Sequence, residues 1–147
     1  MQTPGHYEVS TDRSRLDIAL IHDFLRSSYW AQGIPRAVVE RSIQHSLCFG
    51  AFLDGRQVGF ARVVSDFAAI AYVADVFVVP EHRGRGISKL LMRAIVDHPD
   101  LQGLRRLLLA TRDAHGLYAK FGFEPLRHPE DFMTVHKPDV YRDGNAA

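Results

Sequence analysis

The sequence predicts a mixed α+β fold, and three observations support this prediction. The chain has 147 residues, of which 46% are hydrophobic and 24% charged, as is typical of one compact globular domain. Strand-like segments precede an alternation of strand, helix, strand and helix, which favours a mostly antiparallel sheet flanked by helices. The Asp54-Gly55 pair marks a tight hairpin inside the strand block. We therefore expect a single domain over residues 1–147, with a disordered tail from about residue 143.

The first part of the chain is predicted to contain a short strand, 7–10, and two helices. Asp12 or Ser14 is suited to cap the first helix, whose apolar stripe comprises Leu16, Leu20, Phe24 and Leu25. A glycine and a proline indicate that residues 29–35 form a loop. The second helix, 36–45, follows a proline, which is favoured in a first helical turn.

The remaining elements follow from apolar patterns and turn residues. Strands are expected over 47–53 and 57–65, and a further strand over 70–79 ends at Pro80. Apolar residues at helical spacing then predict a helix over 86–96. The last predicted elements are a strand at 106–110, a helix at 114–121 and two weaker strands at 123–126 and 133–136.

Charge and cysteine content exclude several classes of protein. The chain has 18 Lys and Arg against 17 Asp and Glu, so it lacks the basic surplus of most nucleic-acid-binding proteins. Cys48 is the only cysteine, which rules out an internal disulfide and favours a reducing compartment. No apolar run has the length of a membrane span, and the first residues do not resemble a signal peptide. We expect a cytoplasmic protein that binds neither nucleic acid nor membrane.

The stretch VFVVPEHRGRGISKLL, residues 76–91, joins a predicted strand to a predicted helix through two glycines and several basic residues. The unpaired N–H groups of a helix N-terminus attract anions, and glycines let a phosphate approach the backbone. This pattern indicates a site for a pyrophosphate, although a tight turn with solvated arginines would look similar. A P-loop needs Lys followed by Ser or Thr after a longer loop, and a Rossmann motif needs a third glycine where Lys89 stands.

This stretch resembles the acetyl-CoA signature of the Gcn5-related N-acetyltransferases (GNAT), with Arg83, Gly86 and Ser88 on its defining positions. Ser88 stands where the family has Gly or Ala. The segment LYAKFGF, residues 117–123, is similar to the family's second signature, and the order of elements also matches this fold over nearly the whole chain. The resemblance implies direct transfer of an acetyl group from acetyl-CoA to an amine.

The same resemblance implies which residues bind the cofactor. The backbone of Val76, Phe77 and Val78 would pair with the pantetheine arm, and one N–H group there would polarise the acetyl carbonyl. The backbone from Gly84 to Ser88 would hold the pyrophosphate. The expected cofactor-binding residues of this stretch are Arg83, Gly84, Arg85, Gly86, Ile87 and Ser88. Thr111 and Ala114 fall where the family often has Asn and Ala.

Two residues are candidates for moving protons. Tyr118 occupies the family's general-acid position, although its ring could instead pack beside Phe121 as part of an apolar helix face. Asp75 shares a strand face with apolar residues and is costly to bury alone. It is a candidate base or amine-binding residue, and the alternative is a structural carboxylate paired with Arg62 or Arg112.

Further expectations concern the acceptor and the partners. Tyr29 and Trp30 lie in the loop that in this family usually lines the acceptor pocket, but they could equally be core aromatics. Cys48 is expected to be an inert buried thiol, and the histidines lack metal-binding spacing, so no metal is expected. A homodimer is possible. The rival to an enzyme is a non-catalytic acyl-CoA-binding or regulatory module of the same fold, and the sequence does not identify the acceptor, which would be a small molecule or a peptide.

Overall fold

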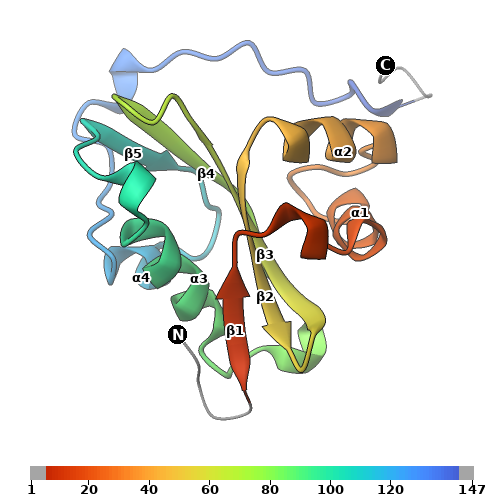
Figure 1. The fold of residues 1–147 in the computed structure, drawn as a ribbon. Coiled ribbons are helices and arrows are strands. Elements are labelled where there is room, and N and C mark those ends of the chain that lie inside the picture. Colours follow the sequence, from red (N-terminus) through yellow and green to blue (C-terminus); the bar gives the residue numbers. More distant parts are fainter. Residues whose placement is uncertain (1–5, 143–147) are drawn as a thin grey trace.

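The computed structural model describes residues 6–142 and confirms the α+β class (Figure 1). The predicted disordered tail from residue 143 lies outside the described residues. The strands are β1 (Tyr7–Ser10), β2 (Leu47–Leu53), β3 (Arg56–Ser65), β4 (Ile70–Val78) and β5 (Arg106–Leu109). The helices are α1 (Ile18–Arg26), α2 (Arg36–Gln44), α3 (Ile87–Val96) and α4 (His115–Ala119).

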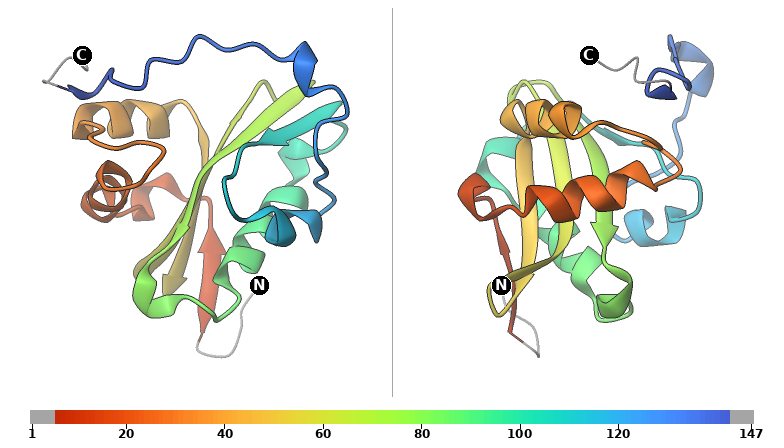
Figure 2. Two further views of the ribbon diagram at one scale, coloured as in Figure 1. Left: turned by 180° about the vertical axis from the view of Figure 1, so that it is seen from behind. Right: turned by 90° about the vertical axis from the view of Figure 1, so that its right-hand side faces the viewer.

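The five strands form one sheet in the order β1-β2-β3-β4-β5. Every neighbouring pair is antiparallel except β4 and β5, which are parallel and are connected through α3. Helices α1 and α2 cover one face of the sheet, and α3 covers the other (Figures 1 and 2). The strand and helix predicted at the chain's glycine-rich junction are therefore β4 and α3.

Local signals in the sequence explain most element boundaries. Asp54 and Gly55 have φ angles of 50° and 83°, as a tight hairpin between β2 and β3 requires. Helix α1 begins later than predicted. Asp12 caps a short 3-10 turn instead, and the Asp17 carboxylate accepts a hydrogen bond from the Leu20 N–H at 3.0 Å to start the α-helix.

The two weak strands predicted at 123–126 and 133–136 are wrong, since neither segment is a strand in the structure. Pro125 lacks a backbone N–H and interrupts any ladder in the first segment. The second segment runs extended and exposed across one end of the molecule towards α2 (Figure 1). The alternation of apolar and polar residues in these two segments was therefore not sufficient to form a strand.

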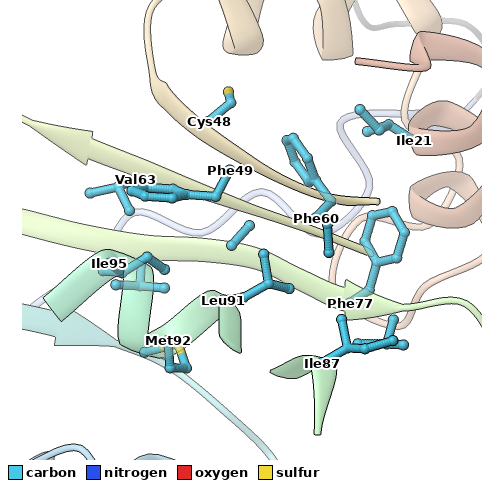
Figure 3. Close-up of a cluster of buried hydrophobic side chains, with 14 of the residues drawn as sticks. Ile21, Cys48, Phe49, Phe60, Val63, Phe77, Ile87, Leu91, Met92 and Ile95 are labelled. Carbon is cyan, nitrogen blue, oxygen red and sulfur yellow. The ribbon is translucent and has the colours of Figure 1, made fainter. Parts of the chain in front are cut away.

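The core lies on both faces of the sheet (Figure 3). On one side, Ile87, Leu91 and Ile95 of α3 are almost completely buried against the strands. On the other side, the Phe77 ring of β4 stacks on Phe24 of α1, with ring centroids 4.0 Å apart. This packing fixes α3 and β4 relative to each other, and so positions the glycine-rich junction between them.

Replacing Gly59 with alanine is expected to destabilise the fold by about 1–3 kcal/mol, because a side chain there would overpack the sheet. A Cβ at this position would lie 3.1 Å from the Phe77 carbonyl oxygen and 3.3 Å from the Ile87 Cγ2 atom. Urea denaturation measures the loss. Gly116→Ala is the control, since no other part of residues 6–142 beyond its own helix and chain neighbours lies within 4 Å of its Cβ position. Equal stability of Gly59→Ala and the wild type would show that β4 and α3 can both move away from the new methyl group without cost.

Candidate active site

Strand β4 has an open edge next to the glycine-rich junction. Its pairing with β5 runs only from Ile70 to Val73, so residues 74–78 have no strand on that side among the described residues. The Val79 N–H bonds to the Val58 carbonyl of β3, at 2.9 Å. Because backbone groups alternate along a strand, the N–H groups of Val76 and Val78 face the open edge. An extended ligand with amide groups can pair there as an additional strand does.

A bulge shapes this part of β4. Phe60 pairs with Phe77 and Arg62 pairs with Ala74, so Ala61 faces two residues, Asp75 and Val76. Asp75 has a φ angle of 56°, in the left-handed region that non-glycine residues rarely adopt. An extra residue of this kind bends the strand, and bulges occur frequently next to active sites.

The junction itself forms a backbone cradle, which we define as residues 83–88. Gly84 and Gly86 have φ angles of 77° and 80°, and no described residue beyond the chain neighbours lies within 4 Å of a Cβ built on either. Gly86 is the N-cap of α3, and no side chain caps this helix. The first N–H groups of α3 therefore lie beside open space with a favourable helix dipole, which suits a phosphate group.

Two arginines of the cradle are held by neighbouring groups. The Arg83 Nε atom donates to the Val78 carbonyl at 3.1 Å, and the Arg85 Nη1 atom donates to the Tyr7 hydroxyl at 3.0 Å. The Tyr7 hydroxyl also lies 2.8 Å from the His82 Nδ1 atom. These contacts tie β1 to the cradle and fix positive charge beside it.

The predicted acceptor residues lie across the sheet from α3, in the loop between α1 and α2. The rings of Tyr29 and Trp30 pack edge to face with centroids 5.1 Å apart, and both side chains are about half exposed. The Arg112 guanidinium lies 3.9 Å from the centre of the Tyr29 ring. Since both aromatic side chains are exposed, neither is a core residue, and they remain candidates for contacting an acceptor.

Asp75 pairs with Arg62, which is one of the alternatives that the sequence left open. Its Oδ2 atom lies 2.8 Å from the Arg62 Nε atom, and its Oδ1 atom accepts a hydrogen bond from the Trp30 indole at 2.8 Å. The structure thus brings Asp75 and Trp30 together. The role of Asp75 as a base or amine-binding residue stays a prediction.

Tyr118 lies on α4 and is 9% exposed, with its ring packed edge to face against Phe123 at 6.0 Å. Burial raises the pKa of its hydroxyl above the usual value of 10.0, and the nearby Tyr29 and Asp113 raise it further. A phenol with a raised pKa stays protonated at neutral pH, so Tyr118 is available as a proton donor.

Other predicted features have structural rather than catalytic surroundings. Cys48 is buried, and burial raises its pKa to about 11, so its thiol is mostly protonated at neutral pH. The Thr111 hydroxyl accepts a hydrogen bond from the Ala114 N–H at 3.1 Å and so stabilises the start of α4. Within residues 6–142, no cluster of three or more metal-binding side chains could hold a metal ion. No helix in this range is long and apolar enough to span a membrane.

Sequence reasoning missed the contacts that connect distant segments. Tyr7, which touches the cradle, is 78 residues from Arg85, and Trp30 is 45 residues from Asp75. The sequence suggests Arg112 only as a partner for Asp75, whereas it lies over the Tyr29 ring and its backbone N–H donates to the Tyr29 hydroxyl at 3.3 Å. No periodic pattern in the sequence indicates these pairs.

Comparison with known proteins places this architecture in a family. A model of the acetyltransferase (GNAT) family matches residues 16–123, which is more than half of the chain. A curated relative from Gibberella zeae, named as an acetyltransferase, is 30% identical over 141 residues, covering 80% of this chain and 78% of its own. The chain therefore belongs to the GNAT acetyltransferase family.

Solved structures agree with this assignment. The crystal structure of a GNAT-family protein from Xanthomonas campestris pv. campestris is 61% identical, with a TM-score of 0.91, and the match covers 93% of this chain and 97% of that one. A Clostridium acetobutylicum acetyltransferase solved with acetyl-CoA has the same fold, with a TM-score of 0.64 at 16% identity, and covers 89% of this chain and 95% of its own. The family resemblance inferred from the two signatures is thus confirmed.

Proposed function

We propose that this protein transfers an acetyl group from acetyl-CoA directly to a primary amine. One observation carries the proposal: the open edge of β4 ends at Val78, and one short 3-10 turn, Pro80–His82, separates it from the cradle of residues 83–88, whose Arg83 side chain bonds back to the Val78 carbonyl. These two features suit the two chemical parts of coenzyme A, since the pantetheine arm contains amide groups and the pyrophosphate is an anion. The GNAT family uses acetyl-CoA, and the neighbour from Clostridium acetobutylicum was solved with it.

Each residue of the site has a proposed role. In the strand Val76, Phe77 and Val78, the backbone groups of Val76 and Val78 bind the pantetheine arm, while Phe77 pairs with β3. The cradle, residues 83–88, holds the pyrophosphate, with Arg83 and Arg85 as fixed charges nearby. Tyr29 and Trp30 line the side on which the amine enters. Acetyl-CoA supplies an activated thioester.

The transfer requires a proton donor for the leaving group, and we assign this role to Tyr118. The neutral amine nitrogen forms a bond to the acetyl carbon, the carbon–sulfur bond breaks, and the sulfur leaves as a thiolate that must gain a proton. Tyr118, which burial keeps protonated, donates that proton. The amine loses its own proton to solvent, and Tyr118 regains one from there.

An acceptor screen tests the proposed function. The protein is incubated with acetyl-CoA and a panel of amines that includes amino acids, polyamines, aminoglycosides and peptide N-termini, and free thiol is measured. We expect thiol release only when a suitable amine is present, together with the mass of the acetylated product. Acetyl-CoA binding without amine-dependent thiol release across the panel would favour the rival function, a non-catalytic acyl-CoA-binding module.

Replacing Gly86 with alanine is expected to raise the Kd for acetyl-CoA by about tenfold, because a methyl group would occupy the space that a phosphate needs. Isothermal titration calorimetry measures this change. Gly103→Ala is a matched control, since Gly103 has a φ angle of 75° and equally open surroundings but lies away from the cradle. An equal loss of affinity in both variants would mean that backbone strain alone, and not the cradle, is responsible.

A further inference from the structure

Asp75 occupies a conformation that needs support. Its φ angle of 56° places it in the left-handed region, at the bulge where two residues of β4 face one residue of β3. Aspartate and asparagine tolerate this region better than other non-glycine residues, but the conformation persists only where the surroundings hold it. The contacts of the Asp75 side chain are therefore part of what shapes β4 beside its open edge.

The Asp75 carboxylate contacts Arg62 and Trp30 directly and Ser46 through Arg62. The Asp75 side chain is 10% exposed and the Arg62 side chain 19%. Arg62 also donates from its Nη1 atom to the Ser46 hydroxyl at 3.1 Å, and that hydroxyl donates to the Ser42 carbonyl at 2.6 Å. The carboxylate is thus anchored through β3 to the end of α2.

Trp30 is the residue of this hydrogen-bond network that belongs to the acceptor loop. Its ring is 42% exposed and packs against Tyr29 and Phe24, while its indole N–H donates to the Asp75 Oδ1 atom at 2.8 Å. These ring contacts leave a large part of Trp30 exposed, and the indole hydrogen bond adds a directional contact that fixes the orientation of the ring. Phe24 in turn stacks on Phe77, which belongs to the proposed cofactor strand.

We propose that Asp75 is a positioning residue that locks Trp30 and the acceptor loop onto the bulge of β4. The carboxylate holds the indole with one oxygen and Arg62 with the other, so the loop that meets the amine and the strand that binds acetyl-CoA keep a fixed relation. Asp75 then sets the acceptor pocket and does not act as the base. The kinetic part of this proposal rests on the proposed function, whereas the spectroscopic part does not.

Trp30 is the only tryptophan in the chain, so it reports on the lock directly. In a two-dimensional ¹H–¹⁵N spectrum of the wild type, its indole N–H is expected to exchange with water at least about tenfold more slowly than a free indole, because it is hydrogen-bonded to a charged group. Exchange as fast as that of a free indole would overturn the proposal. This measurement needs neither a variant nor an acceptor.

Asp75→Asn is expected to release the indole. The single amide oxygen of asparagine would remain with the charged Arg62 side chain, and the amide nitrogen cannot accept a hydrogen bond from Trp30. We expect acrylamide to quench Trp30 fluorescence about twofold more efficiently in this variant, since the freed ring is more accessible to solvent. Asp54→Asn is the matched control, because Asp54 is also an aspartate at positive φ, at 50°, in the β2–β3 turn. Unchanged quenching in Asp75→Asn would contradict the lock.

Trp30→Phe separates positioning from proton transfer, because it removes the indole N–H and leaves Asp75 intact. With an amine found in the acceptor screen, we expect it to raise the acceptor KM about tenfold and to change kcat little. The double variant Trp30→Phe/Asp75→Asn should then have nearly the same acceptor KM and kcat as Asp75→Asn alone. If Asp75 were the base, Asp75→Asn would lower kcat by about 100-fold while Trp30→Phe kept it, and the proposal would be wrong.

Discussion

Replacing Tyr118 with phenylalanine is expected to lower kcat by about 100-fold or more, since a positioned general acid contributes about 10²–10⁴-fold to a rate. The phenylalanine ring can keep the edge-to-face contact with Phe123, so the fold should change little. The acetyl-CoA Kd should also stay close to that of the wild type, because only the proton donor is lost. Steady-state kinetics with an amine from the acceptor screen measure kcat, and calorimetry measures binding.

The pH dependence gives this prediction a second test. Burial, with help from Tyr29 and Asp113, raises the pKa of Tyr118 above 10.0, and the acid is active in its protonated form. The wild-type kcat should therefore be insensitive to this group below about pH 10 and fall above it, as the hydroxyl loses its proton. Tyr118→Phe should lack that decline.

Tyr72→Phe is the control for the loss of a tyrosine hydroxyl, because Tyr72 is exposed and lies in the part of β4 that pairs with β5, outside the open edge. Its kcat should match that of the wild type. A Tyr118→Phe enzyme that kept its kcat within about threefold at every pH would rule out the acid role and leave Tyr118 as a packing residue.

The sequence predicted those parts of the fold that depend on near neighbours. Asp54-Gly55 specifies its hairpin through two positive φ angles, and the apolar spacing of Ile87, Leu91 and Ile95 specifies α3. The cradle was predictable for the same reason, because its glycines and its helix start lie within six residues. Local chemistry also misled in one place, since Asp12 and Asp17 are both good caps and only the second begins an α-helix.

The candidate site was predicted as a set of separate residues, but its arrangement was not. Tyr29 and Trp30 were predicted from one loop, Asp75 from its strand and Tyr118 from the second signature. The contacts that connect Tyr29, Trp30 and Asp75 depend on how that loop lies against β4. The positive φ angle of Asp75 arises from a change of register between β3 and β4, which alternation along one strand cannot reveal. The strands wrongly predicted near the carboxyl end show the same limitation, because a strand needs a partner that its own sequence does not specify.

Arg62→Met is expected to lower the free energy of unfolding by about 3 kcal/mol. The Asp75 side chain is 10% exposed, and removing the guanidinium leaves it with the Trp30 indole as its one hydrogen-bond donor within residues 6–142. The Ser46 hydroxyl also loses one of its partners. Breaking a buried ion pair by removing one partner typically costs about 3–5 kcal/mol, and the partial exposure of this pair favours the lower end. Urea denaturation followed by far-UV circular dichroism measures the change.

A double-mutant cycle shows whether this loss belongs to the pair. In the Asp75→Asn background, Arg62→Met should lower the free energy of unfolding much less, because no buried charge is then left unpaired. We expect a coupling free energy of about 1–3 kcal/mol between the two changes. Arg26→Met is the control for an exposed pair, since Arg26 and Asp23 lie 2.7 Å apart with side chains 59% and 71% exposed, and it should cost less than about 1 kcal/mol. Strictly additive effects of the Arg62 and Asp75 changes would show that the pair does not hold the bulge. In that case the register of β3 and β4 alone maintains the strained φ angle of Asp75. Asp75 would then hold the Trp30 indole without support from Arg62 of β3.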